Sequence, residues 1–469
     1  MGQVGDATPG STPTRLGASP ADGEVAPALP TNLGPEEFLA RGDEEMAQGR
    51  SDNAIAAYTQ AIRLRPGMVR AYRQRGFAEA LRRRDDNAIA DYTTALRLSP
   101  GDVELYFLRG RCYSVSGRQD LAIADYTRAL QLSPENAGLF YYRGYAHYVN
   151  KETDLAIEDY NASLALAPHD FQALVQRAYL LETKRSFAEA IPGLTELIRL
   201  YPAMADAYYM RGYAEDQLNE ADAAIADYRK LMQLAPRDSR AYGGLGALLL
   251  KRGNSGEAVD VLSLALTVSP EDPAFYAERG DAYLSLGRRD NARADFQAAL
   301  ERAPHLPEAL EGRAECEILD GNPGAARADF DLVLLARPAD ARARVERGAL
   351  EQRQGQFAAA LTDLSGAVAA APADAKACNA LAWLLAVCPD PAIRNGTEAV
   401  VRANQACGLT EWKDPALLET LAAASAEAAD FAAAVRWEEQ AIALHPAGDE
   451  LAEPRRRLAL YRRHATFEP

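Results

Sequence analysis

The sequence is poor in the side chains that build disulfide frameworks and metal centres. Its 469 residues include five cysteines and five histidines. The number of cysteines is odd and no two have CxxC spacing, a pattern typical of a reducing compartment. The histidines are scattered along the chain, without the clustering of a metal-binding motif. We therefore expect no metal, no cofactor and a cytoplasmic location.

Basic residues and long apolar runs are also scarce. Lysine and arginine total 51 against 67 aspartates and glutamates, which gives a net charge of −16. Such an acidic chain is a poor candidate for binding nucleic acid, because phosphate contacts rely on Lys and Arg. No run approaches the roughly 18 apolar residues of a membrane-spanning helix. We expect neither a nucleic-acid partner nor insertion into a membrane.

Sequence motifs of catalytic sites are missing as well. The chain has no GxxxxGK[ST], GxSxG or HExxH motif, so phosphate-binding loops, serine nucleophiles on a sharp turn and zinc proteases of these types are not indicated. The glycine-rich stretch GGLG at 243–246 is better explained by helix packing. We expect no catalytic residue and no enzyme activity.

A 34-residue period fills most of the chain. The stretch AIADYTRALQLSP at 122–134 returns in closely similar form at 54–66 and at 88–100. With Pro35 as position 1, ten repeats fit end to end up to residue 374. Position 20 is always alanine, position 32 always proline, position 8 glycine or alanine, and position 24 aromatic or leucine. A strict period of this length predicts a repeat architecture.

Each repeat is predicted to form two amphipathic helices. Positions 4, 8 and 11 share one helix face, and positions 20, 24 and 27 share another. Small residues at 8 and 20 allow the two helices to approach closely, and rings at 4 and 24 fill the space around the contact. Proline at 32 ends the second helix. Asp or Asn at position 34 caps the next helix in seven repeats.

These features resemble the tetratricopeptide repeat, with which they share the period, the Gly or Ala at 8, the Ala at 20, the aromatic residue at 24 and the Pro at 32. The resemblance implies an all-α fold: a right-handed α-α superhelix, or solenoid, of about 12 helix pairs with a C-terminal capping helix. It also implies a concave groove, lined by the first helix of each repeat, that binds a protein or peptide.

Four parts of the chain are expected. Residues 1–34, rich in Pro, Gly and Ala, form a disordered tail. Residues 35–374 form the ten in-register repeats. Residues 375–446 form two divergent repeats, with a five-residue insertion near 387–396. Residues 447–469 form a capping helix and tail, in which the helix covers roughly 452–463 and its arginines are interpreted as a solvated surface.

Two opposite charges recur inside the repeat. Position 7 is Arg in nine of ten repeats and position 23 is Asp in seven. Both lie on largely apolar seams, where an unpaired charge would be costly. Pairing within a repeat leaves two mismatches, whereas pairing with the preceding repeat leaves four, and the seventh repeat loses both charges together, at Leu245 and Val261. We predict ion pairs within repeats and interpret Asp125 and its equivalents as structural.

The expected groove positions are 2, 5, 6, 9 and 12 of each first helix. In repeats two to six they carry many aromatic residues and a few arginines, the usual chemistry of a peptide-binding hot spot. The alternative is that some of the rings pack between neighbouring first helices. The predicted binding residues are Arg73, Phe77, Phe107, Arg111, Tyr141, Tyr145, Tyr148, Tyr179, Tyr209 and Tyr213.

The same positions turn acidic in repeats eight and nine. They either attract a basic ligand segment or form a solvated face, and the sequence favours neither. Some members of the family hold a C-terminal carboxylate with Lys and Asn at positions 5 and 9, a pattern absent here. The acidic residues are Glu278, Asp281, Glu308, Glu311 and Glu315.

The expected function is therefore that of a scaffold for protein–protein interaction. It would bind an extended peptide or a helix of its partner in the groove. A self-associating scaffold and a regulatory subunit of an enzyme are the alternatives, and the residues indicate neither the partner nor the oligomeric state.

Overall fold

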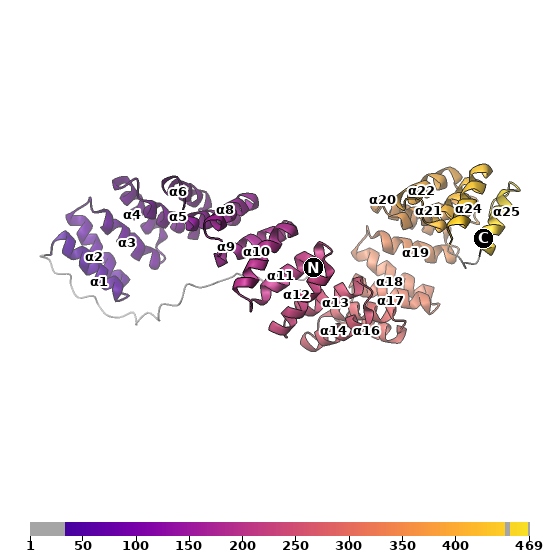
Figure 1. The fold of residues 1–469 in the computed structure, drawn as a ribbon, viewed down its shortest axis with the longest axis horizontal. Coiled ribbons are helices and arrows are strands. Elements are labelled where there is room, and N and C mark those ends of the chain that lie inside the picture. The colour runs from indigo at the N-terminus through magenta and orange to yellow at the C-terminus, as the bar shows by residue number, and fades with distance from the viewer. Residues whose placement is uncertain (1–32, 446–450, 468–469) are drawn as a thin grey trace. The chain divides into compact units, whose positions relative to one another are not determined.

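The computed structural model describes residues 33–445 and 451–467. Within these ranges it contains 25 helices and no strands, which confirms the all-α class (Figure 1). The chain divides into an N-terminal body, residues 1–224, and a C-terminal body, residues 225–469. In each body consecutive helices pack against each other as stacked pairs. The boundary between the bodies falls inside α12.

The ten regular repeats consist of a 13-residue first helix and a 14-residue second helix. The first helices are α1 (Pro35–Ala47), α3 (Val69–Leu81), α5 (Val103–Val115), α7 (Ala137–Val149), α9 (Phe171–Thr183), α11 (Ala205–Gln217), α13 (Ser239–Lys251), α15 (Pro273–Ser285), α17 (Pro307–Leu319) and α19 (Ala341–Arg353). The second helices are α2 (Ser51–Leu64), α4 (Asp85–Leu98), α6 (Gln119–Leu132), α8 (Thr153–Leu166), α10 (Phe187–Leu200), α12 (Ala221–Leu234), α14 (Ser255–Val268), α16 (Arg289–Arg302), α18 (Pro323–Ala336) and α20 (Phe357–Ala370).

Five helices follow the regular array. They are α21 (Ala375–Val387), α22 (Gly396–Leu409), α23 (Pro415–Glu427), α24 (Phe431–Leu444) and α25 (Ala452–Tyr461). In the regular repeats the second helix begins 16 residues after the first, but α22 begins 21 residues after α21. The longer connection holds the residues CPDPAIRN. The pair α23 and α24 returns to the regular spacing.

The expected tail over 1–34 and the segment 446–450 lie almost entirely outside the described residues. The arginines of the last helix are described, and one of them departs from the expected solvated surface. Arg457 is buried, whereas Arg455 and Arg456 on the same helix are exposed. Its partners are given below with the C-terminal segment.

Close contact between position 8 and position 24 holds each helix pair together. In the third repeat Ala122 and Tyr126 are buried at the centre of this contact. A methyl group added to Gly110 would lie 2.8 Å from a ring carbon of Tyr126. Glycine is therefore required here because the ring rests directly on the backbone of the facing helix.

The caps of the first helices follow the predicted pattern. The side chain of Asp102 accepts hydrogen bonds from the backbone N–H groups of Glu104 and Leu105, at 3.0 and 3.3 Å. Asn136 and Asp170 cap α7 and α9 in the same way. Each side chain satisfies N–H groups that have no partner inside the helix.

The predicted ion pairs form within repeats. Arg109 donates from Nε and Nη2 to the two carboxylate oxygens of Asp125, at 2.8 and 2.7 Å. Burial raises the pKa of the Asp125 carboxyl, and the hydrogen bonds from Arg109 oppose that rise. The six pairs with this bidentate geometry are Arg75–Asp91, Arg109–Asp125, Arg143–Asp159, Arg279–Asp295, Arg313–Asp329 and Arg347–Asp363.

The same arginines also reach back to the preceding repeat, which the sequence did not lead us to expect. Nη1 of Arg109 donates to the hydroxyl of Thr93 at 3.1 Å. Thr93 occupies position 25 of the second repeat, so the arginine bonds 16 residues ahead and 16 residues behind. In the other five pairs the backward acceptors are Thr59, Thr127, Ser263, Gln297 and Asp331.

Removing one member of a pair should be more damaging than removing both. We expect Asp125→Ala to lower the free energy of unfolding by about 3 kcal/mol, because it leaves the charge of Arg109 without its partner. The combination of Arg109→Leu with Asp125→Val, which copies Leu245 and Val261, should recover most of the loss. Urea unfolding, with hydrogen exchange over α5 and α6, measures both effects. A double variant less stable than Asp125→Ala would contradict the structural role of the pair.

Candidate functional site

Side-chain contacts connect the first helices of repeats two to five. We call the surface formed by Phe77, Phe107, Arg111, Tyr141, Tyr145, Tyr148 and Tyr179 the aromatic face. Three side-chain contacts link the four helices in series: Arg73 pairs with Glu104, Phe107 contacts Tyr142, and Tyr148 contacts Tyr179. All of these residues belong to the N-terminal body.

Some rings of this surface pack between helices, as the alternative interpretation predicted. The ring of Phe107 lies 5.0 Å from that of Tyr142, edge to face, and Tyr142 lies 5.4 Å from Tyr141. The hydroxyl of Tyr141 donates to Gln172 at 2.8 Å. Burial raises the pKa of Tyr141 to about 12. Phe107 and Tyr141 are therefore half-buried side chains that pack between the first helices.

Other rings remain open to solvent. Phe77, Tyr145 and Tyr179, all at position 9, are 41, 39 and 48 % exposed. Arg111 is exposed at the same position, and its guanidinium lies 5.7 Å from the ring centre of Phe107. Tyr148 is half-buried and contacts both exposed tyrosines: its ring centre lies 6.2 Å from that of Tyr145 and 6.3 Å from that of Tyr179.

An aliphatic border next to these rings was missed by the sequence reasoning. Leu81, Val115 and Val149 occupy position 13 of α3, α5 and α7, and each is more than 40 % exposed. Position 13 lies one helical turn after position 9, so this spacing was the available signal. The exposed part of the aromatic face is therefore wider and more apolar than predicted.

Three predicted residues stand apart from this arrangement. Arg73 forms an ion pair with Glu104 at 2.5 Å, so its charge is balanced within the protein. Tyr209 and Tyr213 on α11 stack on each other, with ring centres 6.4 Å apart, and Tyr213 also contacts Phe187 of α10 at 5.8 Å. The two tyrosines form their own pair.

The acidic residues of α15 and α17 lie in the C-terminal body and are partly neutralised. Glu308 pairs with Arg337 at 2.7 Å, and Arg342 lies 3.4 Å from Glu311 and 4.0 Å from Glu315. Burial raises the pKa of Asp281 to about 7, assisted by the charge of Glu315, although this side chain retains solvent access. The cluster therefore offers a basic ligand less free charge than its sequence suggested.

Glu278 differs from its acidic neighbours. One of its carboxylate oxygens is buried without a hydrogen-bond partner. Burial raises the pKa of Glu278 to about 8, and the charges of Asp272 and Asp281 act in the same direction. Glu278 is therefore held as the neutral acid near neutral pH.

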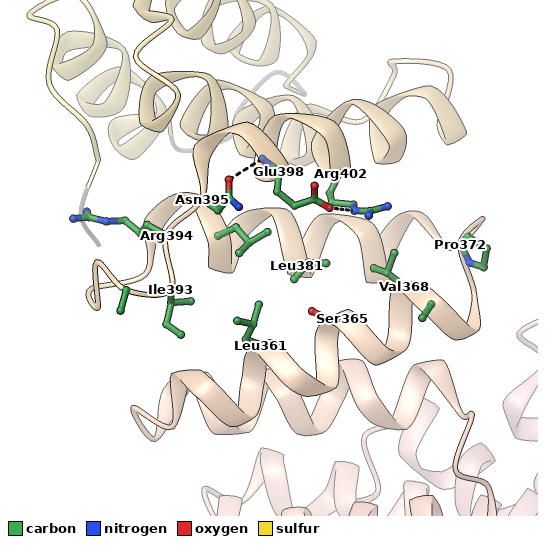
Figure 2. Close-up of a pocket in the computed structure, with 13 residues that line it drawn as sticks. Leu361, Ser365, Val368, Pro372, Leu381, Ile393, Arg394, Asn395, Glu398 and Arg402 are labelled. Atoms are coloured by element: carbon green, nitrogen blue, oxygen red, sulfur yellow. Dashed lines mark hydrogen bonds and ion pairs between the residues drawn. The ribbon is translucent and has the colours of Figure 1, made fainter.

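A pocket of about 620 Å³ opens where the regular array ends (Figure 2). Aliphatic side chains line it from α20, α21 and the long connection before α22. Figure 2 also shows Glu398 and Arg402 on α22 joined at one wall, where Arg402 Nε donates to Glu398 at 2.7 Å. The aliphatic lining includes Leu361, Val368, Leu381, Leu385 and Ile393.

This pocket occupies the seam that the recurring ion pair fills elsewhere. Leu381 stands at position 7 of the eleventh repeat, and Arg402 stands at position 23. A pocket of about 610 Å³ on the equivalent seam between repeats eight and nine is lined by the intact pair Arg313 and Asp329. In the eleventh repeat Leu381 and Arg402 therefore replace the Arg–Asp pair of this seam, and Arg402 bonds to Glu398 instead.

Family models match successive stretches of this helix-pair array. Models described as tetratricopeptide repeat match residues 39–103, 175–239, 217–280 and 278–343, and one described as TPR repeat matches residues 113–151. Together they cover more than half of the chain. The chain belongs to the tetratricopeptide repeat family. Membership supports, in general terms, a scaffold for protein interaction.

Several solved structures are similar to this chain at low sequence identity. A chain of the Naa15/Naa10 complex bound to HypK-THB is 17 % identical, with a TM-score of 0.43 over 84 % of this chain and 66 % of that one. A chain of the APC/C hetero-tetramer Cut9-Hcn1 is 17 % identical, with a TM-score of 0.41 over 92 % and 90 %. Yeast Tom70 is 16 % identical, with a TM-score of 0.37 over 92 % and 95 %. A comparison with curated protein sequences found no match.

Metal-ligand clusters and membrane-spanning helices are both absent from the part of the chain that the structure describes. Within residues 33–445 and 451–467, no three His, Cys, Asp or Glu side chains gather closely enough to hold a metal ion. Among the helices of the same ranges, none combines the length and apolar character that crossing a membrane requires.

Glu278 should make the C-terminal body less stable at alkaline pH. Since its pKa is raised to about 8 in the folded state, its contribution is complete below the unfolded-state value near 4.3 and is lost as the pH rises toward 8. We expect the urea midpoint to fall between pH 5 and pH 9, and to fall less in Glu278→Gln. Glu308→Gln is the matched control: burial alone would raise the pKa of Glu308, but its hydrogen bonds and the charge of Arg337 together lower it. Equal pH profiles for Glu278→Gln and the unaltered chain would refute this assignment.

Building the recurring ion pair into the seam of the eleventh repeat should require both of its members. Leu381→Arg alone places a cation in a buried site near Arg402, and we expect a loss of about 2 kcal/mol. Adding Arg402→Asp supplies a carboxylate at position 23 and should recover at least about 1 kcal/mol. Hydrogen exchange of α21 in the two single variants and the double variant measures this coupling. Additive losses would show that the longer connection prevents the pair from forming.

Proposed function

We propose that the chain is a non-enzymatic scaffold that binds an extended peptide or a helix of a partner protein on the aromatic face. In this proposal the first helices form the floor of a concave groove, as is usual for stacked helix-pair repeats. Membership of the tetratricopeptide repeat family supports the general role. The choice of surface rests on the side chains of repeats two to five.

One observation carries the choice of surface. Three large rings and one arginine remain exposed at the same position of four consecutive first helices, namely Phe77, Arg111, Tyr145 and Tyr179. Monomeric surfaces rarely gather large apolar side chains in this way unless they bind a partner. Tyrosine and arginine are also the side chains that most often dominate binding energy.

The surrounding contacts define the chemistry of a suitable partner. Leu81, Val115 and Val149 add apolar area beside the rings, so apolar side chains of the partner would be buried there. Arg111 forms no ion pair with the acidic residues that the structure describes, and its guanidinium stacks on Phe107. A partner segment with alternating apolar side chains and an acidic residue opposite Arg111 fits this surface.

Removing the exposed rings should weaken the binding of such segments. Peptides selected from a displayed random library on the unaltered chain should bind a Phe77→Ala/Tyr145→Ala/Tyr179→Ala variant at least tenfold more weakly, since each anchor contributes about 1–2 kcal/mol. Fluorescence anisotropy measures the affinities, and circular dichroism verifies the helix content of the variant.

The matched control replaces exposed leucines on second helices. Leu98→Ala/Leu132→Ala removes exposed apolar side chains that lie outside the aromatic face and should leave peptide affinity unchanged. If the selected peptides bind the folded triple variant as tightly as the unaltered chain, the aromatic face is not the binding surface.

A further inference from the structure

The C-terminal segment docks on the last two repeats through a small number of side chains. Between residues 451 and 467, the buried side chains are Pro454, Arg457, Tyr461 and Phe467. The other described residues of this stretch are exposed or half-buried, including most of its arginines. The segment is therefore held on the last two repeats at these four side chains.

Arg457 enters a site made by two glutamates. The twelfth repeat carries Glu438 at position 24, where the regular repeats have an aromatic residue or leucine. Glu438 is completely buried, and Arg457 Nε donates to it at 3.0 Å. Arg457 Nη2 also lies 2.5 Å from Glu419 of α23, whose other oxygen lies 2.7 Å from His445 Nε2. The guanidinium of Arg457 therefore lies against two carboxylates.

The site requires a cation to be stable. Burial raises the pKa of Glu438 to about 7, and Arg457 acts to lower it. One oxygen of Glu438 has no hydrogen-bond partner, and the buried hydroxyl of Tyr461 has none either. A carboxylate in such surroundings is costly unless a positive group pairs with it.

Beyond α25 the chain contacts aromatic residues of the last two repeats, Phe431 of the twelfth and Trp383 of the eleventh. His464 stacks on Phe431, with ring centres 5.1 Å apart and planes inclined by 4°. Phe467 is 7 % exposed, and its ring centre lies 6.2 Å from that of Trp383 and 5.7 Å from the guanidinium of Arg457.

Trp383 stands at a position that is open in other repeats. It occupies position 9 of α21, which is equivalent to the exposed Phe77, Tyr145 and Tyr179. Position 9 of the following first helix, α23, is Ala423, which is 3 % exposed. Around the last two repeats, the surface that other repeats leave to solvent is therefore covered.

We propose that Glu419, Glu438 and Trp383 form a binding site for a segment with an arginine and an aromatic residue ten positions later, and that residues 452–467 occupy it as a ligand in cis. The ligand that we propose for this site is a segment of a partner protein with the same arginine and aromatic residue. It must displace the chain's own segment, which therefore restricts access to the site. The site belongs to the C-terminal body and is independent of the aromatic face.

A labelled peptide tests the proposal on the full-length chain. The probe is a fluorescent peptide of residues 451–469, and the receptor is an Arg457→Ala/Phe467→Ala chain. We expect the peptide to bind this variant at least tenfold more tightly than the unaltered chain, because the tethered segment competes at a high effective concentration. Hydrogen exchange over 452–461 should show that the variant has released its own segment, while α19 and α20 keep their protection.

Two controls match these changes. A peptide with the same two substitutions should not bind, and an Arg455→Ala/Arg463→Ala chain, altered at exposed arginines, should behave like the unaltered chain. Adding Trp383→Ala to the receptor variant should weaken the peptide at least tenfold.

Three outcomes would overturn the proposal. The first is equal binding of the peptide to both chains, or absence of binding to a variant whose segment is released. The second is unchanged hydrogen exchange of the segment in the variant, which would mean that these anchors do not hold it. The third is a concentration-dependent dimer that the peptide dissociates, which would assign the site to a second copy of the chain instead of a partner protein.

Discussion

The contact between the ring at position 24 and the glycine at position 8 determines the geometry of the array. In the third repeat the ring of Tyr126 lies so close to Gly110 that a single added methyl group would collide with it. Two helices held at this distance cannot bury their remaining apolar surface alone, so each pair must stack on the next. Because the buried contacts use positions 8, 20 and 24, the side chains at positions 9 and 13 of α3, α5 and α7 remain exposed.

That division explains which parts of the fold were accessible to sequence reasoning. Positions such as Ala122 and Pro134 recur in every regular repeat, and their periodicity contains enough information to predict two helices, their caps and the pairing of Arg109 with Asp125. The backward bond from Arg109 to Thr93 escaped prediction because position 25 varies among Thr, Ser, Gln and Asp, which all accept a hydrogen bond but share no obvious chemical class.

The candidate site was predictable only in outline. The residue types at positions 5 and 9 indicated an aromatic surface, but a helical period cannot distinguish a ring such as Tyr141, which packs between helices, from Tyr145, which remains exposed. Arg73 and Arg457 show the same limit for charges. Their partners, Glu104 and Glu438, come from neighbouring helices, so their pairing depends on the distance between helices and not on spacing along one helix.

The two-directional bonding of the arginines has a consequence for how the gene could change in length. Each such arginine bonds to residues 16 positions ahead and 16 positions behind, so loss or duplication of a whole 34-residue repeat rejoins equivalent partners. An indel of any other size inside a helix pair would separate an arginine from its aspartate. The one long connection in the array, before α22, occurs in a repeat whose position 7 is Leu381. There the intrarepeat bond is absent, and five additional residues were tolerated.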